Sequence, residues 1–441
     1  MVVEEKERLA REIVRRLHEA GYRAYFAGGY VRDLLLGRKG KDVDVATDAP
    51  LGEVRRLFPR TIEVGAQFGV LLVVEGGVSV EVARFRTDLG YEDGRHPVDV
   101  RFTGPEEDAL RRDFTINGMF YDPIREEVVD FVGGQEDLRR RVVRAIGDPD
   151  RRFSEDRLRL LRAVRFAANL GFDIEERTFE AIRRHATTVT QVAWERIGEE
   201  IVRILTEGGA RRGFELLDRA GLLAPVLPEV AALKGVEQSP DYHPEGDVFT
   251  HTMLMLGHLD GTTETLAWGV LLHDIGKPAC AARVGQKITF YGHCTLGAEM
   301  AVAVCQRLKR SRATWERVAY LVRNHLRVLQ APKMRVSTLK RFLAEEGIDE
   351  LLELVRIDAL SSNGDLSYYE FCRRKREEFG REKLRPAPLL RGRDLLELGF
   401  RPGPLFGEIL RAVEDAQLEG TLGSREEAVE WVERTYGHLR G

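Results

Sequence analysis

The sequence has no apolar run near the roughly 20 residues that a membrane-spanning helix needs, so a membrane partner is not expected. It has four cysteines, and none lies in a CxxC pair, which disfavours a disulfide scaffold and favours a reducing cytoplasm. The opening segment MVVEEKERLAREIVRRL is charged and helical in pattern, unlike a signal peptide. There is no internal repeat and no low-complexity segment. These absences predict a globular cytoplasmic protein.

The charge balance is close to neutral, with 68 Lys and Arg against 72 Asp and Glu. The resulting net charge of −4 argues against a nonspecific nucleic-acid coat but leaves room for a local basic groove. Arginine dominates the positive residues. Its planar fork suits bidentate contact with phosphate, although codon usage in a GC-rich genome would give the same bias.

The chain of 441 residues exceeds what one hydrophobic core serves, which predicts two to four packed units. Residues 1–20 have helical spacing, and short β-rich runs follow between residues 22 and 102. After about residue 150 the β runs disappear and amphipathic helical periodicity continues nearly to the end. We therefore expect an α+β protein, with an α/β head followed by an all-α neck, body and tail.

The strongest local signal is FAGGYVRDLLLGRKGKDVDVATD. Gly28 and Gly29 follow a strand-like run, where the missing Cβ lets main-chain amides approach a triphosphate. Arg32 falls on the first helical turn after them, where it could clamp a phosphate. The segment therefore predicts a nucleotide-phosphate cradle.

Three carboxylates complete this signal. Asp42 and Asp44 fall in a β-like run, where a period of two would place both on one face of the sheet. Glu81, in VSVEVARF, is a candidate third carboxylate on a neighbouring strand. Oxygen ligands of this kind hold the two hard cations, here Mg²⁺, that phosphoryl transfer uses.

At this point the chain resembles the class II CCA-adding enzymes and bacterial poly(A) polymerases of the polymerase-β-like nucleotidyltransferase superfamily. LRRDFTINGMFYDP is similar to the family's RRDxxxNA segment, and RFSEDRLRLLRAVRFA to its nucleotide-selecting helix. The resemblance implies a polymerase-β-like head at 1–145, a helical neck at 146–230, an HD-type domain at 231–370 and an RNA-binding tail at 371–441. It also implies a Mg²⁺-dependent tRNA nucleotidyltransferase that adds CCA from CTP and ATP.

The selecting segment makes sense from its spacing. Glu155, Asp156, Arg159, Arg162 and Arg165 recur at intervals of three or four, so they can share one side of a helix. The resemblance implies that Asp156 and Arg159 read the Watson–Crick edge of the incoming base. C and A both present an amine beside an acceptor, and G and U present the opposite pattern.

Further roles come from the resemblance. It implies that Arg162 and Arg165 reach the triphosphate or base, and that Arg112, then Arg111, bind triphosphate or sugar. Asp113 and Asn117 would position the ribose or brace the loop, and Gly118, where Ala is more common, is interpreted as packing. The flexible loop ARFRTDLGYEDGRHPVDVRF has full length, which disfavours enzymes that add only CC. It keeps Arg86, Asp93 and Arg95 and has His96 where a basic Arg is common.

A second constellation has the order H…HD…H…H…D, which resembles the HD-superfamily metal phosphohydrolases. Such ligands suit Mn, Ni, Fe or Zn better than Mg alone. Lys277 is a candidate phosphate contact, and His243 is either a further member or a turn cap. The resemblance allows phosphatase and phosphodiesterase repair of the tRNA 3′ end. The predicted ligands are His251, His273, Asp274, His293, His325 and Asp358.

The RNA path is predicted from residues 373–393, with nine basic and three acidic residues, and from the helix around residues 194–197. A solvated helix and linker would give the same composition. Because there is no aromatic ladder, recognition of the folded acceptor and T arms of tRNA by shape is favoured. Alternatives remain: an A-only tRNA-adding enzyme, a poly(A) polymerase, or an HD phosphohydrolase whose head merely binds RNA.

Overall fold

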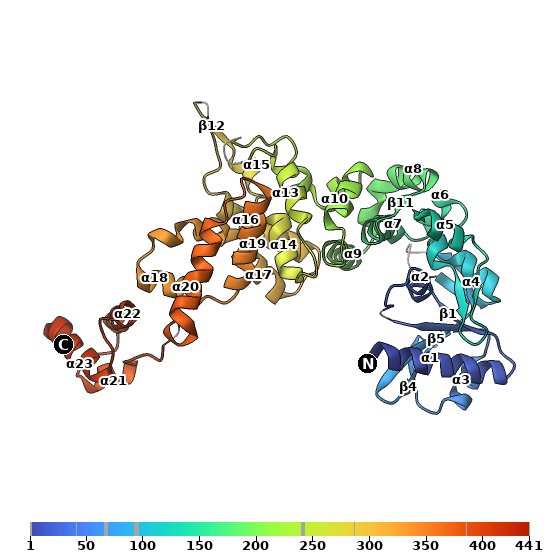
Figure 1. Cartoon of the computed structure of the whole chain (residues 1–441), viewed down its shortest axis with the longest axis horizontal. Coiled ribbons are helices and arrows are strands. Elements are labelled where there is room, and N and C mark those ends of the chain that lie inside the picture. The colour runs from blue at the N-terminus through green and yellow to red at the C-terminus, as the bar shows by residue number, and fades with distance from the viewer. Residues whose placement is uncertain are drawn as a thin grey trace. The chain divides into compact units, whose positions relative to one another are not determined.

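The head is organised by a seven-stranded sheet, of which Figure 1 labels β1, β4 and β5. The order of its strands is β3-β4-β5-β2-β1-β8-β9. The computed structural model describes residues 2–40, 42–65, 69–91, 97–239, 243–285, 287–384 and 386–440. The strands of the sheet are β1 (Ala24–Ala27), β2 (Asp44–Thr47), β3 (Thr61–Gly65), β4 (Val70–Glu75), β5 (Val78–Arg84), β8 (Phe120–Asp122) and β9 (Glu127–Val129).

The register of three central strands brings the predicted site together. β1 pairs antiparallel with β2, which places Ala27 opposite Asp44. β2 pairs parallel with β5, which places Asp44 opposite Glu81. In β5 the neighbours Val80 and Val82 are buried while Glu81 is exposed, as a period of two requires. The apolar face therefore anchors the strand, and the carboxylates lie on the open face.

Helices pack around this sheet and continue into the neck. α1 (Val2–Glu19) buries Leu9, Ile13 and Leu17, which recur at helical spacing. The remaining elements of the first unit are α2 (Gly29–Leu35), α3 (Leu51–Leu57), a β6 (Arg86–Tyr91) and β7 (Pro97–Phe102) hairpin, α4 (Pro105–Arg111), η2 (Thr115–Asn117), α5 (Gly134–Arg140), β10 (Val142–Val143), α6 (Pro149–Glu155), α7 (Leu158–Leu170), β11 (Asp173–Ile174), α8 (Glu176–His185), η3 (Ala186–Gln191), α9 (Trp194–Thr206), α10 (Ala210–Arg219), α11 (Leu223–Val226) and α12 (Pro228–Ala231).

The second unit is mainly helical. A kink interrupts α20 at Gly380, whose φ of 66° suits glycine. Its elements are α13 (Val248–Leu256), α14 (Glu264–Leu272), α15 (Lys277–Cys280), β12 (Ala282–Val284), β13 (Lys287–Thr289), α16 (His293–Arg307), α17 (Arg312–Asn324), η4 (His325–Lys333), α18 (Val336–Leu343), α19 (Ile348–Ser361), α20 (Ser367–Leu384), α21 (Gly392–Glu397), α22 (Pro404–Glu419), α23 (Arg425–Tyr436) and η5 (Gly437–Leu439).

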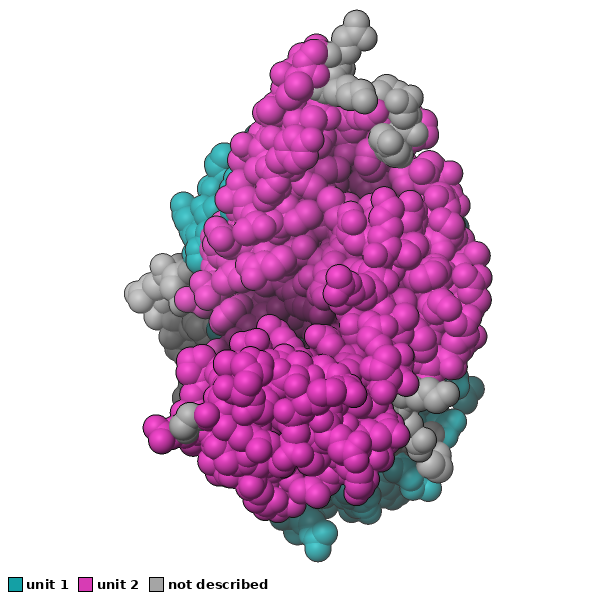
Figure 2. Space-filling view, turned by 90° about the vertical axis from the view of Figure 1, so that its left-hand side faces the viewer, with its two compact units in different colours: residues 1–231, 259–261 teal, residues 232–258, 262–441 magenta. Residues whose placement is uncertain are grey.

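The chain divides into two compact units, coloured separately in Figure 2: residues 1–231 with 259–261, and residues 232–258 with 262–441. The expected α+β class is confirmed, but the expectation of no strands after residue 150 is wrong. The exceptions, β11, β12 and β13, are two or three residues long and lack the alternating run that reveals a strand in sequence. All four cysteines are unpaired, and no described helix is long and apolar enough to cross a membrane.

Candidate active site

The glycine pair forms the turn between β1 and α2. Gly28 has φ 72° and ψ −142°, a conformation that a residue with Cβ rarely adopts. A Cβ on Gly28 would also lie 3.4 Å from Arg112 Nη1. That distance is an ordinary van der Waals contact, so it is the positive φ that requires glycine in this turn of the predicted phosphate cradle.

The three predicted carboxylates lie at the end of the same sheet, but not entirely as the sequence pattern suggested. β2 begins at Asp44, so Asp42 lies just before the strand and not within it. The predicted alternation holds in the exposure of the side chains, because Asp42 and Asp44 are exposed and Val43 between them is buried. Asp42 accepts a hydrogen bond from Lys6 Nζ at 2.6 Å, and its side chain is largely exposed. Strand register does not fix Asp42, and only its Oδ1 contacts Lys6, so Oδ2 remains available to a metal.

Asp44 and Glu81 are the better-placed pair, since they are partners across adjacent strands. Partial desolvation, then the Glu81 charge, raise the pKa of Asp44 to about 6, although the residue remains solvent-exposed. Two carboxylates that repel each other in this way fit a divalent cation, which would relieve the repulsion.

Beside the glycine turn lies a cavity of about 450 Å³. Its walls include every residue that the sequence predicted to bind nucleotide, and two that it missed, Phe166 and Arg203. Phe166 lies on α7 with the guanidinium of Arg165 over its ring, 4.2 Å from the centroid. The cavity is lined by Gly28, Gly29, Arg32, Arg111, Arg112, Asp113, Asn117, Asp156, Arg159, Arg162, Arg165, Phe166 and Arg203.

A buried carboxylate that the sequence analysis missed holds the two predicted phosphate-binding arginines of the head. Asp108 accepts from Arg111 Nε at 2.9 Å and from Arg112 Nη2 at 3.0 Å. Burial would raise the pKa of Asp108, but Arg112 and Arg111 lower it below its ordinary value. Its position on α4 at intervals of three and four from the arginines is the signal that could have found it.

A chain of polar contacts crosses the cavity floor from α2 to α7. Arg32 Nη1 donates to Asn117 Oδ1 at 2.8 Å, and Asn117 Nδ2 donates to Asp113 Oδ1 at 3.2 Å. Arg162 donates to Asp113 Oδ2 from Nε at 2.9 Å and from Nη2 at 2.6 Å. Each side chain is thereby fixed by a neighbour before any ligand binds.

The selecting segment is not one continuous helix, which corrects the sequence prediction. α6 ends at Glu155, Asp156 has the extended φ of −142°, and α7 begins at Leu158. Asp156 Oδ1 accepts from the main-chain N of Leu158 at 3.0 Å, a local turn that competes with helix. Only Arg159, Arg162 and Arg165 share a helix. Asp156 still lines the cavity, and its Oδ2 lies 3.3 Å from Arg196 Nη2.

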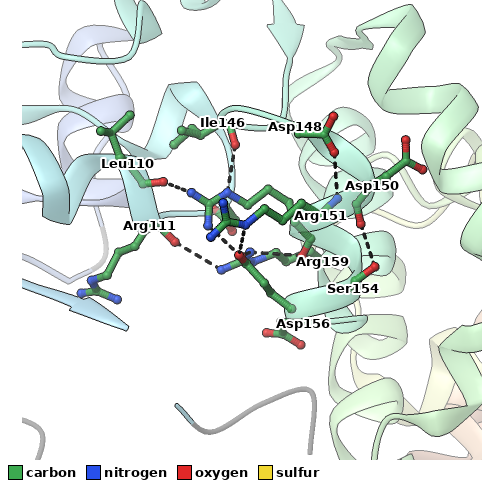
Figure 3. A network of polar contacts seen from close by, with 12 residues as sticks. Leu110, Arg111, Ile146, Asp148, Asp150, Arg151, Ser154, Asp156 and Arg159 are labelled. Atoms are coloured by element: carbon green, nitrogen blue, oxygen red, sulfur yellow. Dashed lines mark hydrogen bonds and ion pairs between the residues drawn. The ribbon is translucent and has the colours of Figure 1, made fainter. Parts of the chain in front are cut away.

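Arg159 is almost fully buried, and its guanidinium donates three hydrogen bonds to neighbouring residues (Figure 3). Nη1 donates to Glu155 Oε2 at 3.1 Å and to the main-chain O of Arg152 at 3.2 Å. Nη2 donates to the main-chain O of Arg111 at 3.2 Å. No residue in the described ranges accepts from Nε, so Nε and one hydrogen of Nη2 remain for a ligand in the cavity.

Two further predictions concern the head loop and Gly118. Asp93, Arg95 and His96 lie outside the described residues, while Arg86 donates its main-chain N–H to Asp108 at 3.2 Å. A Cβ on Gly118 would lie 2.8 Å from Val132 Cγ2, so the space is filled by packing, as predicted.

The predicted HD ligands converge in the second unit. Their inward atoms approach the Asp274 and Asp358 carboxylates. His251 Nε2 lies 3.2 Å from Asp358 Oδ1, and His273 Nε2 lies 3.0 Å from Asp274 Oδ2. The Nε2 atoms of His293 and His325 lie 3.5 and 3.8 Å from Asp274 Oδ1.

The outer nitrogens of these histidines are already occupied. Nδ1 of His273, His293 and His325 contacts the main-chain O of Val270, Phe290 and Val322, respectively, at 2.7–2.9 Å. His273 Nε2, His251 Nε2 and Asp274 Oδ1 are buried, and none of their contacts with the neighbouring side chains has the geometry of a hydrogen bond. Buried polar atoms that converge without partners fit a metal ion.

Two other residues orient this cluster. Glu245 Oε1 lies 2.6 Å from His251 Nδ1 and 3.0 Å from His243 Nδ1, so His243 belongs to the cluster and is more than a turn cap. Lys277 Nζ contacts Asp274 Oδ2 and Gln238 Oε1, both at 2.6 Å, so it is engaged within the site. The sequence analysis missed Glu245 and Gln238, which show no motif.

The basic segment 373–393 lies largely on α20, where several of its charges are neutralised. Arg373 pairs with Glu377, Arg374 and Lys375 pair with Glu378, and Arg376 pairs with Asp349. These contacts fit the solvated-helix interpretation for its first turns. The RNA path therefore stays a prediction.

Comparison with known proteins finds relatives along most of the chain. Three families match successive parts of the chain: the Poly A polymerase head domain at residues 24–144, the probable RNA and SrmB-binding site of polymerase A at 171–234, and the HD domain at 246–363. A CCA-adding enzyme of Levilactobacillus brevis is 31% identical over 426 residues, covering 96% of both chains. The chain belongs to the CCA-adding enzyme family.

Other CCA-adding enzymes match over shorter stretches. The Geobacillus kaustophilus enzyme is 46% identical over 221 residues, which cover 50% of this chain and 54% of that enzyme. The Bacillus pumilus enzyme is 38% identical over 265 residues, covering 60% of this chain and 62% of its own. The crystal structure of the Bacillus stearothermophilus CCA-adding enzyme in complex with CTP superposes with a TM-score of 0.73 at 27% identity, covering 98% of both chains. The predicted family is thus confirmed.

Proposed function

We propose that this chain adds CCA to the 3′ end of tRNA, taking CTP and ATP and releasing pyrophosphate. The observation that carries the proposal is the composition of one cavity. It joins the glycine turn and phosphate-binding arginines to the base-reading candidates Asp156 and Arg159. Membership of the CCA-adding enzyme family, and the CTP complex of the Bacillus stearothermophilus enzyme, support it.

In this proposal the side chains divide the work by chemistry. Arg32 and Arg112, beside the glycine turn, bind the triphosphate. Asp156 accepts from the exocyclic amine of C or A, because a carboxylate has capacity beyond its contacts to Leu158 and Arg196. Arg159 donates from Nε and Nη2 to the adjacent base acceptor. In G and U a ring N–H would face the guanidinium, and a carbonyl would face the carboxylate.

The transfer itself takes place where Asp44, the first residue of β2, lies opposite Glu81 of β5. The RNA 3′-hydroxyl attacks the α-phosphate, the new P–O bond forms, and the bond to pyrophosphate breaks. Asp42, Asp44 and Glu81 are the residues that would hold two Mg²⁺ ions. Bound there, the ions would activate the hydroxyl and neutralise the leaving pyrophosphate.

Stepwise extension tests the specificity. Transcripts that end before C74, C75 and A76 (tRNA numbering) are incubated with each nucleotide alone. We expect CTP to extend the first two and ATP the third. Extension by ATP only, and only of transcripts that end in CC, would establish an A-only enzyme, and unlimited A addition a poly(A) polymerase.

A second activity is proposed for the histidine cluster. The buried atoms of His251, His273 and Asp274, which converge without forming hydrogen bonds, support a metal-dependent phosphohydrolase with Mn, Ni, Fe or Zn. Such a site would restore a free hydroxyl on a damaged 3′ end before synthesis. We further propose the division 1–145, 146–230, 231–370 and 371–441, contact with the tRNA acceptor and T arms, and action in the cytoplasm.

A further inference from the structure

Two main-chain carbonyls at the end of α4 are bound by arginines of the neck. The last carbonyls of a helix have no partner within it and carry partial negative charge. Arg152 donates from Nη2 to the Leu110 carbonyl. Arg159 donates from Nη2 to the Arg111 carbonyl at 3.2 Å, and Figure 3 labels both of these residues. The neck thus fixes the segment that presents Arg111 and Arg112 to the cavity.

Arg152 makes three contacts in different directions from one guanidinium. Besides the Leu110 carbonyl, it donates from Nε to the Ile146 carbonyl at 2.9 Å and from Nη1 to Glu155 Oε2 at 2.7 Å. Its side chain is mostly buried, with 16% exposed. A planar guanidinium can satisfy three such acceptors at once, and a lysine ammonium cannot reproduce that geometry.

Glu155 connects Arg152 to Arg159, the residue proposed to read the base. Its Oε2 accepts from both Arg152 and Arg159. Burial would raise the pKa of Glu155, but Arg152 lowers it below its ordinary value, so the carboxylate stays charged between the two arginines. Arg159 also donates to the main-chain O of Arg152, which closes the network.

We propose that Arg152 is a positioning residue for base selection, which joins the neck to the end of α4 and holds Glu155 against Arg159. The inference rests on the proposed nucleotidyl transfer. Arg152 is absent from the cavity lining, so it acts through Arg159 rather than on the nucleotide. Its three contacts fix the position of the Nε–Nη2 edge of Arg159 relative to the phosphate-binding side chains of Arg111 and Arg112.

Arg151 provides a matched control. It also donates to Glu155, from Nε to Oε1 at 3.0 Å, but its side chain is 81% exposed. It makes no side-chain contact with Leu110 or Ile146 within the described ranges. Removing Arg151 therefore takes one cation from Glu155 and leaves the connection to α4 intact.

The test measures selectivity by single-nucleotide addition. For Arg152→Ala we expect the kcat/KM ratio of ATP over GTP on transcripts ending in CC, and of CTP over UTP on transcripts ending before C74, to fall by about 10-fold. Arg151→Ala should change neither ratio more than about twofold. Arg152→Lys keeps the charge but not the geometry, so it should not restore wild-type selectivity.

Several outcomes are distinguishable. Equal loss of kcat/KM for all four nucleotides, or wild-type ratios in both Arg152→Ala and Arg152→Lys, would overturn the inference. Thermal melting reports whether each variant folds, and Arg152→Lys carries the test if the alanine variant does not. Failure of the unchanged chain to add C or A would instead overturn the proposed function.

Discussion

Arg162 donates two hydrogen bonds to a single oxygen of Asp113, from Nε at 2.9 Å and from Nη2 at 2.6 Å. The arginine belongs to α7 of the neck, and the carboxylate belongs to the loop after α4 of the head. Both line the nucleotide cavity. A contact of this kind makes the shape of the site depend on one buried ion pair.

This pair predicts a pH-dependent stability. Burial would raise the pKa of Asp113, but Arg162 lowers it from 3.8 to about 2. Because this pKa is lower in the folded than in the unfolded chain, the charged carboxylate adds about 2 kcal/mol to the free energy of unfolding. This contribution is complete above about pH 4 and is lost as the pH falls toward 2. We expect Asp113→Asn to have a lower melting temperature than the unchanged chain at pH 7. The difference between the two melting temperatures should become smaller below pH 4. A difference in melting temperature that does not change with pH would contradict this role of the Asp113–Arg162 ion pair.

The base-reading assignment predicts a change in nucleotide choice. Asp156→Asn replaces one accepting oxygen with a donating amide, which suits the carbonyl of U or G. We expect the CTP:UTP and ATP:GTP ratios of kcat/KM to fall by about 10- to 100-fold. Asp150→Asn is the control, because Asp150 pairs with Arg184 and His185 outside the cavity. Equal ratios in Asp156→Asn and the unchanged chain would exclude the assignment.

The two sites are predicted to work independently. His273→Ala removes a converging ligand, so we expect loss of bound transition metal and of hydrolysis of a 2′,3′-cyclic nucleotide. CCA addition should stay within about twofold, because the head carries that chemistry. His258→Ala, an exposed histidine outside the cluster, is the control. If His273→Ala abolishes nucleotide addition while Asp44→Ala leaves the main activity intact, the chain is an HD phosphohydrolase with an RNA-binding head.

Glu245 is predicted to tune the metal affinity without binding the metal. Its Oε1 lies 2.6 Å from His251 Nδ1, so it holds the ring with Nε2 directed toward Asp358. Removal of such an orienting carboxylate typically weakens metal binding 10- to 100-fold. Titration of the metal-depleted Glu245→Gln chain with Mn²⁺ or Ni²⁺ measures this. Affinity equal to that of the unchanged chain would show that the contact is incidental.

The sequence predicted most residues that line the cavity, because these residues belong to short local motifs. Gly28 and Gly29 are marked by the turn they form, and Arg159, Arg162 and Arg165 by their helical spacing. The sequence could not predict the break at Asp156, because the side-chain cap on Leu158 competes with an otherwise strong helical pattern. The sequence also could not predict the contact between Asp42 and Lys6, because the two residues are far apart along the chain.

Residues that act through others were also missed. Asp108, Glu245 and Arg152 each hold a functional side chain, but they are ordinary charged residues in their own helices or loops. The spacing of Asp108 from Arg111 and Arg112 on α4 could have revealed its role. The role of Arg152 depends on a tertiary contact, with the Leu110 carbonyl 42 positions away. A pattern within one sequence carries no record of such contacts.

The central claim is that the carboxylates at the end of β2 carry the transfer. The most direct measurement is single-turnover extension of a tRNA transcript without CCA, with CTP, ATP and Mg²⁺, by the unchanged chain and by Asp44→Asn. Asp48→Asn is the control, since Asp48 pairs with Arg23 at the other end of β2. We predict three added nucleotides by the unchanged chain and the control, and a rate at least about 10³-fold lower for Asp44→Asn. Extension by Asp44→Asn at the normal rate would contradict the account.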